Sequence, residues 1–222
     1  MVKNNSISLP GDEKEHATEK LIHQTFPKKD SLRDGRAVLL RFMQDDDLDR
    51  LHAFYTGLPE HIRVYLRVDV TNKEIVKRRM KPCDRCSFYK ILAFVDEKVV
   101  GEATLNREIH SWKQHLGEIR VIIHPDYQQS GLGKILIRQL YEIASMLKIQ
   151  ILYASIADEQ EGAIKILTKL GFNKEIVKRG HIKDIKGRKH DQFIMACNIH
   201  ELWKHLESLM IEMDTRRGIE HY

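Results

Sequence analysis

Val121-Ile122-Ile123-His124-Pro125-Asp126-Tyr127-Gln128-Gln129-Ser130-Gly131-Leu132-Gly133-Lys134 is the stretch of sequence that decides the fold. Its apolar start completes a predicted strand over residues 116–123, and a His-Pro turn leads from this strand into a loop with two glycines. Leucine and isoleucine then recur every three or four residues from Leu132 to Leu147, a spacing that predicts an amphipathic helix. Strand, glycine loop and helix therefore follow one another directly.

Such a junction favours the binding of a phosphate group. The first turn of a helix has N–H groups without intrahelical partners and a partial positive charge, and glycines let a ligand approach the backbone closely. Two common phosphate motifs do not fit. A P-loop needs Ser or Thr after Gly133-Lys134, where Ile135 stands, and a dinucleotide fingerprint needs glycine at the position of Leu136.

The remaining segments predict a sheet with flanking helices. Strands are expected at 37–42, 88–95, 99–105 and 149–156, with a final hairpin of 174–178 and 192–197. Helices are expected at 13–23, after the acidic cluster 45–47, from a capping box at Thr71 to about Met80, at 163–170 before Gly171, and at 199–213. This order predicts an α/β (α+β) fold with a domain over 35–198, a partly helical or flexible arm over 1–34, and a C-terminal helix and tail over 199–222.

Composition narrows the class of protein. The 222 residues include no run of about 18 apolar residues and begin with a polar segment, so we expect a cytoplasmic protein without a membrane span. A net charge of +5 suits an anionic cofactor or nucleic acid, but no basic and aromatic residues interleave, which makes nucleic acid the less favoured partner. Cys83 and Cys86 form a lone CxxC, and with no second pair we expect free thiols and no metal.

The pattern Gln-x-x-Gly-x-Gly, from Gln128 to Gly133, resembles the acyl-CoA motif of the GNAT acyltransferase superfamily, Arg/Gln-x-x-Gly-x-Gly/Ala. The segment 160–172 is similar to that family's Asn-x-x-Ala-x-x-x-Tyr-x-x-x-Gly-Phe. The resemblance covers residues 38–198 and is strongest over 118–172. It implies a GNAT fold, with a mixed and mostly antiparallel sheet, and transfer of an acyl group from acetyl-CoA to a primary amine.

The resemblance also implies a donor site. The CoA diphosphate would lie against the segment Gln128, Gln129, Ser130, Gly131, Leu132, Gly133 and Lys134, held by backbone N–H groups from Gln129 onward. The backbone of Val121 and Ile123 would pair with the pantetheine arm like an added strand. A β-bulge and splaying of the two central strands, usual in the family, would place the thioester near the Val121 N–H. Gln160 occupies the family's asparagine position and is expected in the same site.

Acid and base follow from the same comparison. An amine with a pKa of about 10.4 is mostly protonated at neutral pH, so a base must remove a proton. Glu118 matches the glutamate of a GNAT subgroup reading Ala-Glu-x-x-Val-x-Val, although an ion pair with Arg120 or a neighbouring strand is the structural alternative. His110, His115 and His124 are other candidates for the base. Leu167 stands where the family has the tyrosine that acts as general acid. This leaves Tyr127, Tyr141 and Tyr153 as candidates for the acid.

The acceptor amine is left open. Residues 38–58 are similar to GNAT modules that acylate protein lysines, and small-molecule amines remain open as acceptors. The protein is expected to be a monomer or a homodimer. The basic run 178–189 could contact the CoA 3′-phosphate or an acidic acceptor, or form a solvated loop. Because of Leu167, the alternative function is a GNAT-shaped sensor or scaffold that binds acyl-CoA without catalysis.

Overall fold

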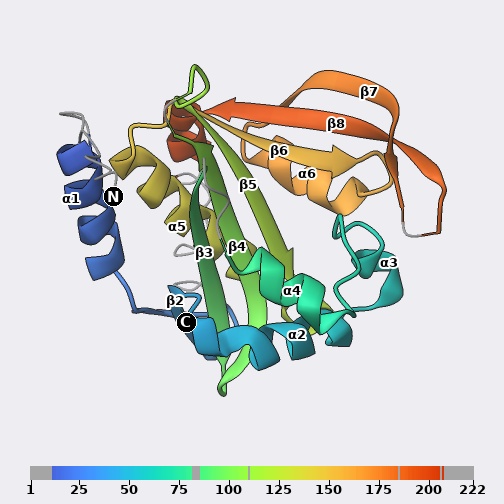
Figure 1. Ribbon diagram of the computed structural model, residues 1–222, viewed down its shortest axis with the longest axis horizontal. Helices are drawn as coiled ribbons and strands as arrows, with labels where there is room; N and C mark the ends of the chain where they lie inside the picture. Colours follow the sequence, from blue (N-terminus) through green and yellow to red (C-terminus); the bar gives the residue numbers. More distant parts are fainter. Residues whose placement is uncertain (1–11, 82–85, 110, 185, 206, 208–222) are drawn as a thin grey trace, which may run out of the picture.

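An eight-stranded sheet runs through the computed structural model, which describes residues 12–81, 86–109, 111–184, 186–205 and 207 (Figure 1). Its order is β1-β2-β3-β4-β5-β6-β8-β7, and all neighbours are antiparallel except β5 and β6. The strands are β1 (Lys28–Ser31), β2 (Ala37–Phe42), β3 (Cys86–Val95), β4 (Lys98–Glu108), β5 (Leu116–Ile123), β6 (Ile151–Ala157), β7 (Asn173–Lys183) and β8 (Lys189–Asn198). The predicted mixed, mostly antiparallel sheet is confirmed.

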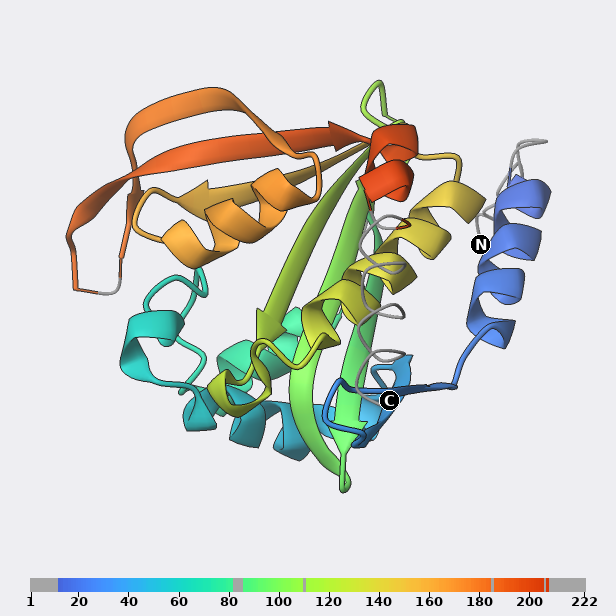
Figure 2. The same cartoon turned by 180° about the vertical axis from the view of Figure 1, so that it is seen from behind.

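Helices cover both faces of this sheet. In chain order they are α1 (Asp12–Gln24), η1 (Asp45–Asp47), α2 (Leu48–Gly57), α3 (Glu60–Arg63), α4 (Lys73–Arg79), η2 (Pro125–Tyr127), α5 (Leu132–Met146) and α6 (Glu161–Lys169), with a further helical segment at 199–205. Helices α2 and α4 lie on one face, and α5 lies on the other with α1 beside it (Figures 1 and 2). Among the described residues, no helix is long and apolar enough to cross a membrane.

Two apolar cores result from the alternation of side chains along the strands. Leu132, Leu136 and Leu140 of α5 are fully buried against the sheet, as the three-and-four spacing predicts. On the opposite face, Leu51 and Phe54 of α2 belong to a second cluster. This arrangement fixes the positions of both ends of β5, between the two cores.

Three local predictions were wrong in detail. The cap of α4 is Asn72 and not Thr71, because the Asn72 Oδ1 accepts the N–H groups of Glu74 and Ile75 at 3.0 and 3.3 Å. Residues 28–31, which we assigned to the partly helical or flexible arm, form an edge strand paired with β2. The last hairpin is longer than expected, so most of the basic run 178–189 lies in β7 and β8.

The division into arm, domain and tail stays a prediction. Its parts at 1–11 and 208–222 lie outside the described residues, as do Cys83 and His110 and the side chain of Cys86.

Candidate active site

Strands β5 and β6 separate halfway along their length. Their parallel pairing covers only Leu116–Glu118 against Ile151–Tyr153, whereas β5 continues to Ile123 and β6 to Ala157 (Figure 1). Past Glu118, the β6-facing edge of β5 therefore has no strand partner in the described part of the chain. This is the splaying that the family resemblance implied. The expected bulge does not fall on β5, since its register with β4 is unbroken and the nearest shift lies in the β3–β4 pair, at Ala93 and Phe94.

The backbone of β5 directs alternate N–H groups to that free edge. On the β4 side, the His124 N–H donates to the Val100 carbonyl at 2.9 Å. On the β6 side, the His115 carbonyl accepts from the N–H of Ile151, the first residue of β6. Backbone groups alternate sides with a period of two, so the N–H groups of Val121 and Ile123 face the side that β6 leaves. An extended ligand can add there as a strand does.

The glycine loop turns between β5 and α5 with two residues in the left-handed region. Gly131 has φ +90° and is the N-cap of α5, and Gln129 has φ +61°. A residue with a Cβ rarely adopts the Gly131 conformation, which explains the glycine at this position. At Gly133 a Cβ would lie 3.1 Å from the Ile123 Cδ1, so helix and strand approach closely there.

The N–H groups of this loop differ in whether a described residue accepts a hydrogen bond from them. Those of Gln129, Ser130, Gly131 and Gly133 make no hydrogen bond to any described residue. By contrast, the Leu132 N–H lies 3.4 Å from the Ser130 Oγ, and the Lys134 N–H donates to the Gly131 carbonyl at 3.0 Å. Four donors thus remain at the positive end of the α5 dipole, an arrangement suited to an anion.

Glu118 lies at the last paired position before the strands separate. Its Oε1 accepts from the Arg67 Nη2 at 2.6 Å, and 19% of its side chain is exposed. Tyr153 is its cross-strand partner on β6, and burial together with the Glu118 charge raises the pKa of that phenol. Glu118 therefore does form an ion pair, but its partner is Arg67 and not the expected Arg120.

Arg120 instead belongs to a buried polar cluster centred on Glu102, which we define as Glu102, Lys90, Arg120, Tyr55 and Thr104. The Glu102 Oε1 lies 3.1 Å from the Arg120 Nη2, 3.3 Å from the Lys90 Nζ and 3.2 Å from the Thr104 Oγ1, and its Oε2 accepts from the Tyr55 hydroxyl. Burial opposes ionisation of this carboxylate, but the two cations and the hydrogen bonds lower the pKa of Glu102 to about 2. Sequence reasoning missed this cluster, although a charged residue amid each of two apolar strands was a readable signal.

The other candidates lie in different surroundings. Gln160 precedes α6, where its Oε1 accepts the Ala157 N–H at 3.0 Å just past the separated part of β6. Leu167 is buried in the core with α5. Tyr141 stacks on Trp203 with ring centroids 4.9 Å apart, on the α5 side, so it is not a neighbour of Glu118. Of these two tyrosines, Tyr153 is the one that lies next to Glu118.

The β7–β8 hairpin continues the sheet beyond β6, and its turn contacts α3 (Figure 1). The Lys186 Nζ lies 2.7 Å from the Glu60 Oε1, and the Tyr65 hydroxyl donates to the Glu159 Oε2 at 2.5 Å. The Arg188 Nε pairs with Asp184 at 2.8 Å. Two cations of the basic run are thus already in ion pairs.

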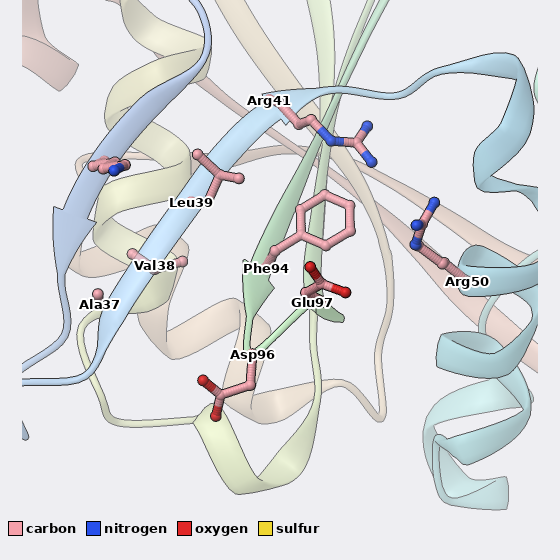
Figure 3. Close-up of a pocket in the computed structure, with 9 residues that line it drawn as sticks. Ala37, Val38, Leu39, Arg41, Arg50, Phe94, Asp96 and Glu97 are labelled. Carbon is pink, nitrogen blue, oxygen red and sulfur yellow. The ribbon is translucent and has the colours of Figure 1, made fainter.

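A cavity of about 420 Å³ lies elsewhere, between β2, the β3–β4 turn and α2 (Figure 3). The Arg41 guanidinium on its border covers the Phe94 ring at 4.3 Å and forms two 2.6 Å bonds to the buried Asp47 carboxylate. Neither Glu118 nor the glycine loop lines this cavity, so we do not place the active site there. No group of residues suited to holding a metal ion occurs within the described ranges.

The sheet with its separated strands β5 and β6 is that of the GNAT class of fold. Residues 40–194 match the family model of the acetyltransferase (GNAT) domain, and the chain belongs to this family, whose members transfer an acetyl group from acetyl-CoA.

The relatives and solved structures agree with this family. The chain is 29% identical over 111 residues to the [ribosomal protein bS18]-alanine N-acetyltransferase of Escherichia coli K12, a match that covers 50% of this chain and 66% of the relative. Among solved structures, the GNAT domain of S. lividans PAT has a TM-score of 0.61 at 17% identity, covering 78% of this chain and 96% of that one. Mycobacterium smegmatis RimJ, in complex with CoA-disulfide, has a TM-score of 0.63 at 13% identity and covers 80% and 93%. These structures bear on the fold alone.

Proposed function

We propose that the protein is an N-acetyltransferase that moves the acetyl group of acetyl-CoA directly to a primary amine. One observation carries the proposal: the edge of β5 that loses its strand partner after Glu118 leads to the glycine loop and the first turn of α5, where four N–H groups have no partner among the described residues. Pantetheine and diphosphate are joined in this same order in CoA. A donor extended along Val121 and Ile123 therefore brings its diphosphate to Gln129–Gly133 without a bend across the sheet.

The donor carbonyl is polarised by the Val121 N–H in this arrangement. The amine nitrogen attacks the thioester carbon, a tetrahedral oxyanion forms, and the C–S bond breaks to release the CoA thiolate. Glu118 lies three residues before Val121, about 10 Å along the strand. The proton of the amine consequently reaches the Glu118 carboxylate through a water molecule, and Arg67 orients that carboxylate.

Tyr153 is the group we propose to protonate the departing thiolate. Burial and the neighbouring Glu118 charge raise the pKa of this phenol, which keeps it in the protonated form that a donor requires. It lies across from Glu118 in the β5–β6 register, whereas Leu167 has no proton to give. Acid and base then come from adjacent strands at the point where the strands separate.

For the acceptor, we propose a protein amine before a small-molecule amine. The named relatives act on the alanine of a ribosomal protein, and the match spans only about two-thirds of their length. A protein N-terminus therefore joins lysine side chains and small amines as candidates. We place the reaction in the cytoplasm, where ribosomal proteins are made.

Calorimetry with acetyl-CoA, followed by thiol-release assays on N-terminal peptides, lysine peptides and polyamines, tests the proposal. We expect micromolar donor binding and turnover with at least one peptide class, lost in Glu118→Gln. Donor binding without turnover on any amine would favour the acyl-CoA sensor, and absence of donor binding would refute the assignment.

A further inference from the structure

The loop between β1 and β2, residues 32–36, lies against the glycine loop although almost a hundred residues separate them. Leu32 is fully buried in the core, and the Gly35 N–H closes a turn on the Leu32 carbonyl at 3.0 Å. Gly35 has φ +82°, which favours glycine in this turn. The β1–β2 loop is therefore a fixed turn and presents the residues around its tip at one position.

Two bonds connect Arg33 to the glycine loop. The Arg33 N–H donates to the Ser130 carbonyl at 2.9 Å, and its Nη1 donates to the Gln129 carbonyl at 3.3 Å. A third contact lies next to them, where the Arg36 guanidinium covers the Tyr127 ring at 4.4 Å. The two hydrogen bonds hold consecutive carbonyls of the glycine loop.

Peptide geometry makes these bonds consequential. In a trans peptide the C=O and the following N–H point in opposite directions. Because Arg33 holds the Gln129 and Ser130 carbonyls, the N–H groups of Ser130 and Gly131 point away from it. These two N–H groups are among the four donors without a partner in the described part of the chain.

We propose that the β1–β2 loop is part of the donor site, with Arg33 as a positioning residue that holds the Ser130 and Gly131 N–H groups toward the CoA diphosphate. This inference rests on the proposed function, and it adds to the site a segment that precedes the residues 40–194 matched by the family model. Preorganised donors bind an anion more tightly because their orientation costs nothing at the moment of binding.

Charge acts in the same direction. Arg36 pairs with Asp34 at 2.6 Å, whereas Arg33 has no carboxylate partner within the ranges that the structure describes. Arg33 is exposed and lies at the carbonyl side of the loop, so it adds a positive charge behind the N–H groups that face the diphosphate position. A replacement of the Arg33 side chain removes this charge and the bond to the Gln129 carbonyl, which orients the Ser130 N–H, while the main-chain bond to the Ser130 carbonyl remains.

The test compares Arg33→Ala with Arg78→Ala, which removes an exposed arginine from α4, also bonded to a main-chain carbonyl, and changes the net charge equally. Acetyl-CoA is titrated by calorimetry, and S-acetylpantetheine, which lacks the diphosphate, is titrated by NMR. We expect Arg33→Ala to raise the Kd of acetyl-CoA about 10-fold while the Kd of S-acetylpantetheine stays within about 2-fold, the loss being that of one charge-assisted hydrogen bond and its orienting effect. Arg78→Ala is expected to bind both ligands as the unaltered protein does.

Other results overturn the inference. Unchanged acetyl-CoA binding by Arg33→Ala removes Arg33 from the donor site, and equal weakening of both ligands reduces it to a general structural role. If the unaltered protein binds S-acetylpantetheine and acetyl-CoA equally, the diphosphate site itself is wrong, and if it binds neither, the proposed function fails with the inference. Should Arg33→Ala lose its thermal unfolding transition, Arg33→Gln replaces it in both titrations.

Discussion

Replacing Glu102 by glutamine tests how the buried cluster behind the active site is held together. Glu102 is fully buried, and the Lys90 side chain is only 3% exposed. Glutamine keeps the shape of the side chain but removes its charge. Lys90 and Arg120 then face a neutral amide in an apolar surrounding, so the effect of the change is electrostatic and packing is almost unaltered.

Two arguments give the same magnitude for the free energy of unfolding that Glu102→Gln removes. Removing one partner of a buried ion pair costs about 3–5 kcal/mol. Independently, the cluster lowers the pKa of Glu102 from 4.5 to about 2, and that difference corresponds to roughly 3 kcal/mol. For a chain of this length, the loss lowers the Tm by roughly 6–20 °C.

The pH dependence separates this explanation from a packing defect. Burial lowers the pKa of Lys90, so the unfolded chain binds more protons at this site than the folded chain does. In the pH range where Lys90 is protonated in the unfolded chain and neutral in the folded chain, the free energy of unfolding therefore rises with pH. Without its carboxylate partner the folded Lys90 loses its proton at lower pH still, so the destabilisation by Glu102→Gln is expected to shrink from pH 7 to pH 9. In the unaltered protein, the lowered pKa of Glu102 contributes stability that is present above pH 4.5 and is lost as the pH falls toward about 2.

Urea unfolding followed by circular dichroism, at pH 7 and pH 9, measures both effects. The control is Glu161→Gln on α6, whose side chain is 77% exposed and lies 3.4 Å from the Lys165 Nζ. That exposed pair is expected to contribute less than about 0.5 kcal/mol. A loss below about 1 kcal/mol for Glu102→Gln at pH 7, or a loss that stays equal at pH 9, would refute the reasoning.

Three further predictions concern single residues. Glu118→Gln is expected to lower kcat by about 10²–10⁴ and leave the Kd of acetyl-CoA unchanged, and steady-state kinetics with calorimetry check both; a kcat within about 3-fold of the unaltered protein removes Glu118 from the base role. Gly131→Ala places a Cβ at φ +90° and is expected to cost about 1–2 kcal/mol in urea unfolding and to weaken acetyl-CoA binding, so unaltered values of both would contradict the loop geometry. Cys197 is buried, and burial raises the pKa of its thiol to about 11, so iodoacetamide at pH 8 is expected to leave it unmodified in the native protein; mass spectrometry that finds rapid alkylation would contradict this.

The sequence predicted what depends on local spacing. The strand, glycine loop and helix from 116 to 147 follow from periodicity and from two glycines, and the structure confirms each element. Edge strand β1 escaped prediction because Lys28–Ser31 has no apolar alternation, and only pairing with β2 makes it a strand. Arg33 escaped for the same reason, since its partners lie near residue 130 and no local pattern connects them.

The partner of Glu118 shows why pairing rules along one strand are insufficient. Glu118 and Arg120 are two residues apart on the same face of β5, which made their ion pair the natural structural alternative. The buried carboxylate of Glu102 competes for the same guanidinium. A fully buried carboxylate without a partner costs more free energy than a partly exposed one that water can reach, so Arg120 pairs with Glu102. Glu118 is left to Arg67, a residue with φ +65° in the segment between α3 and α4, which no rule of spacing could have brought to it. Burial, and not distance along the chain, therefore decides which carboxylate pairs with Arg120, and it leaves Glu118 to Arg67 and to the role of base that we propose for it.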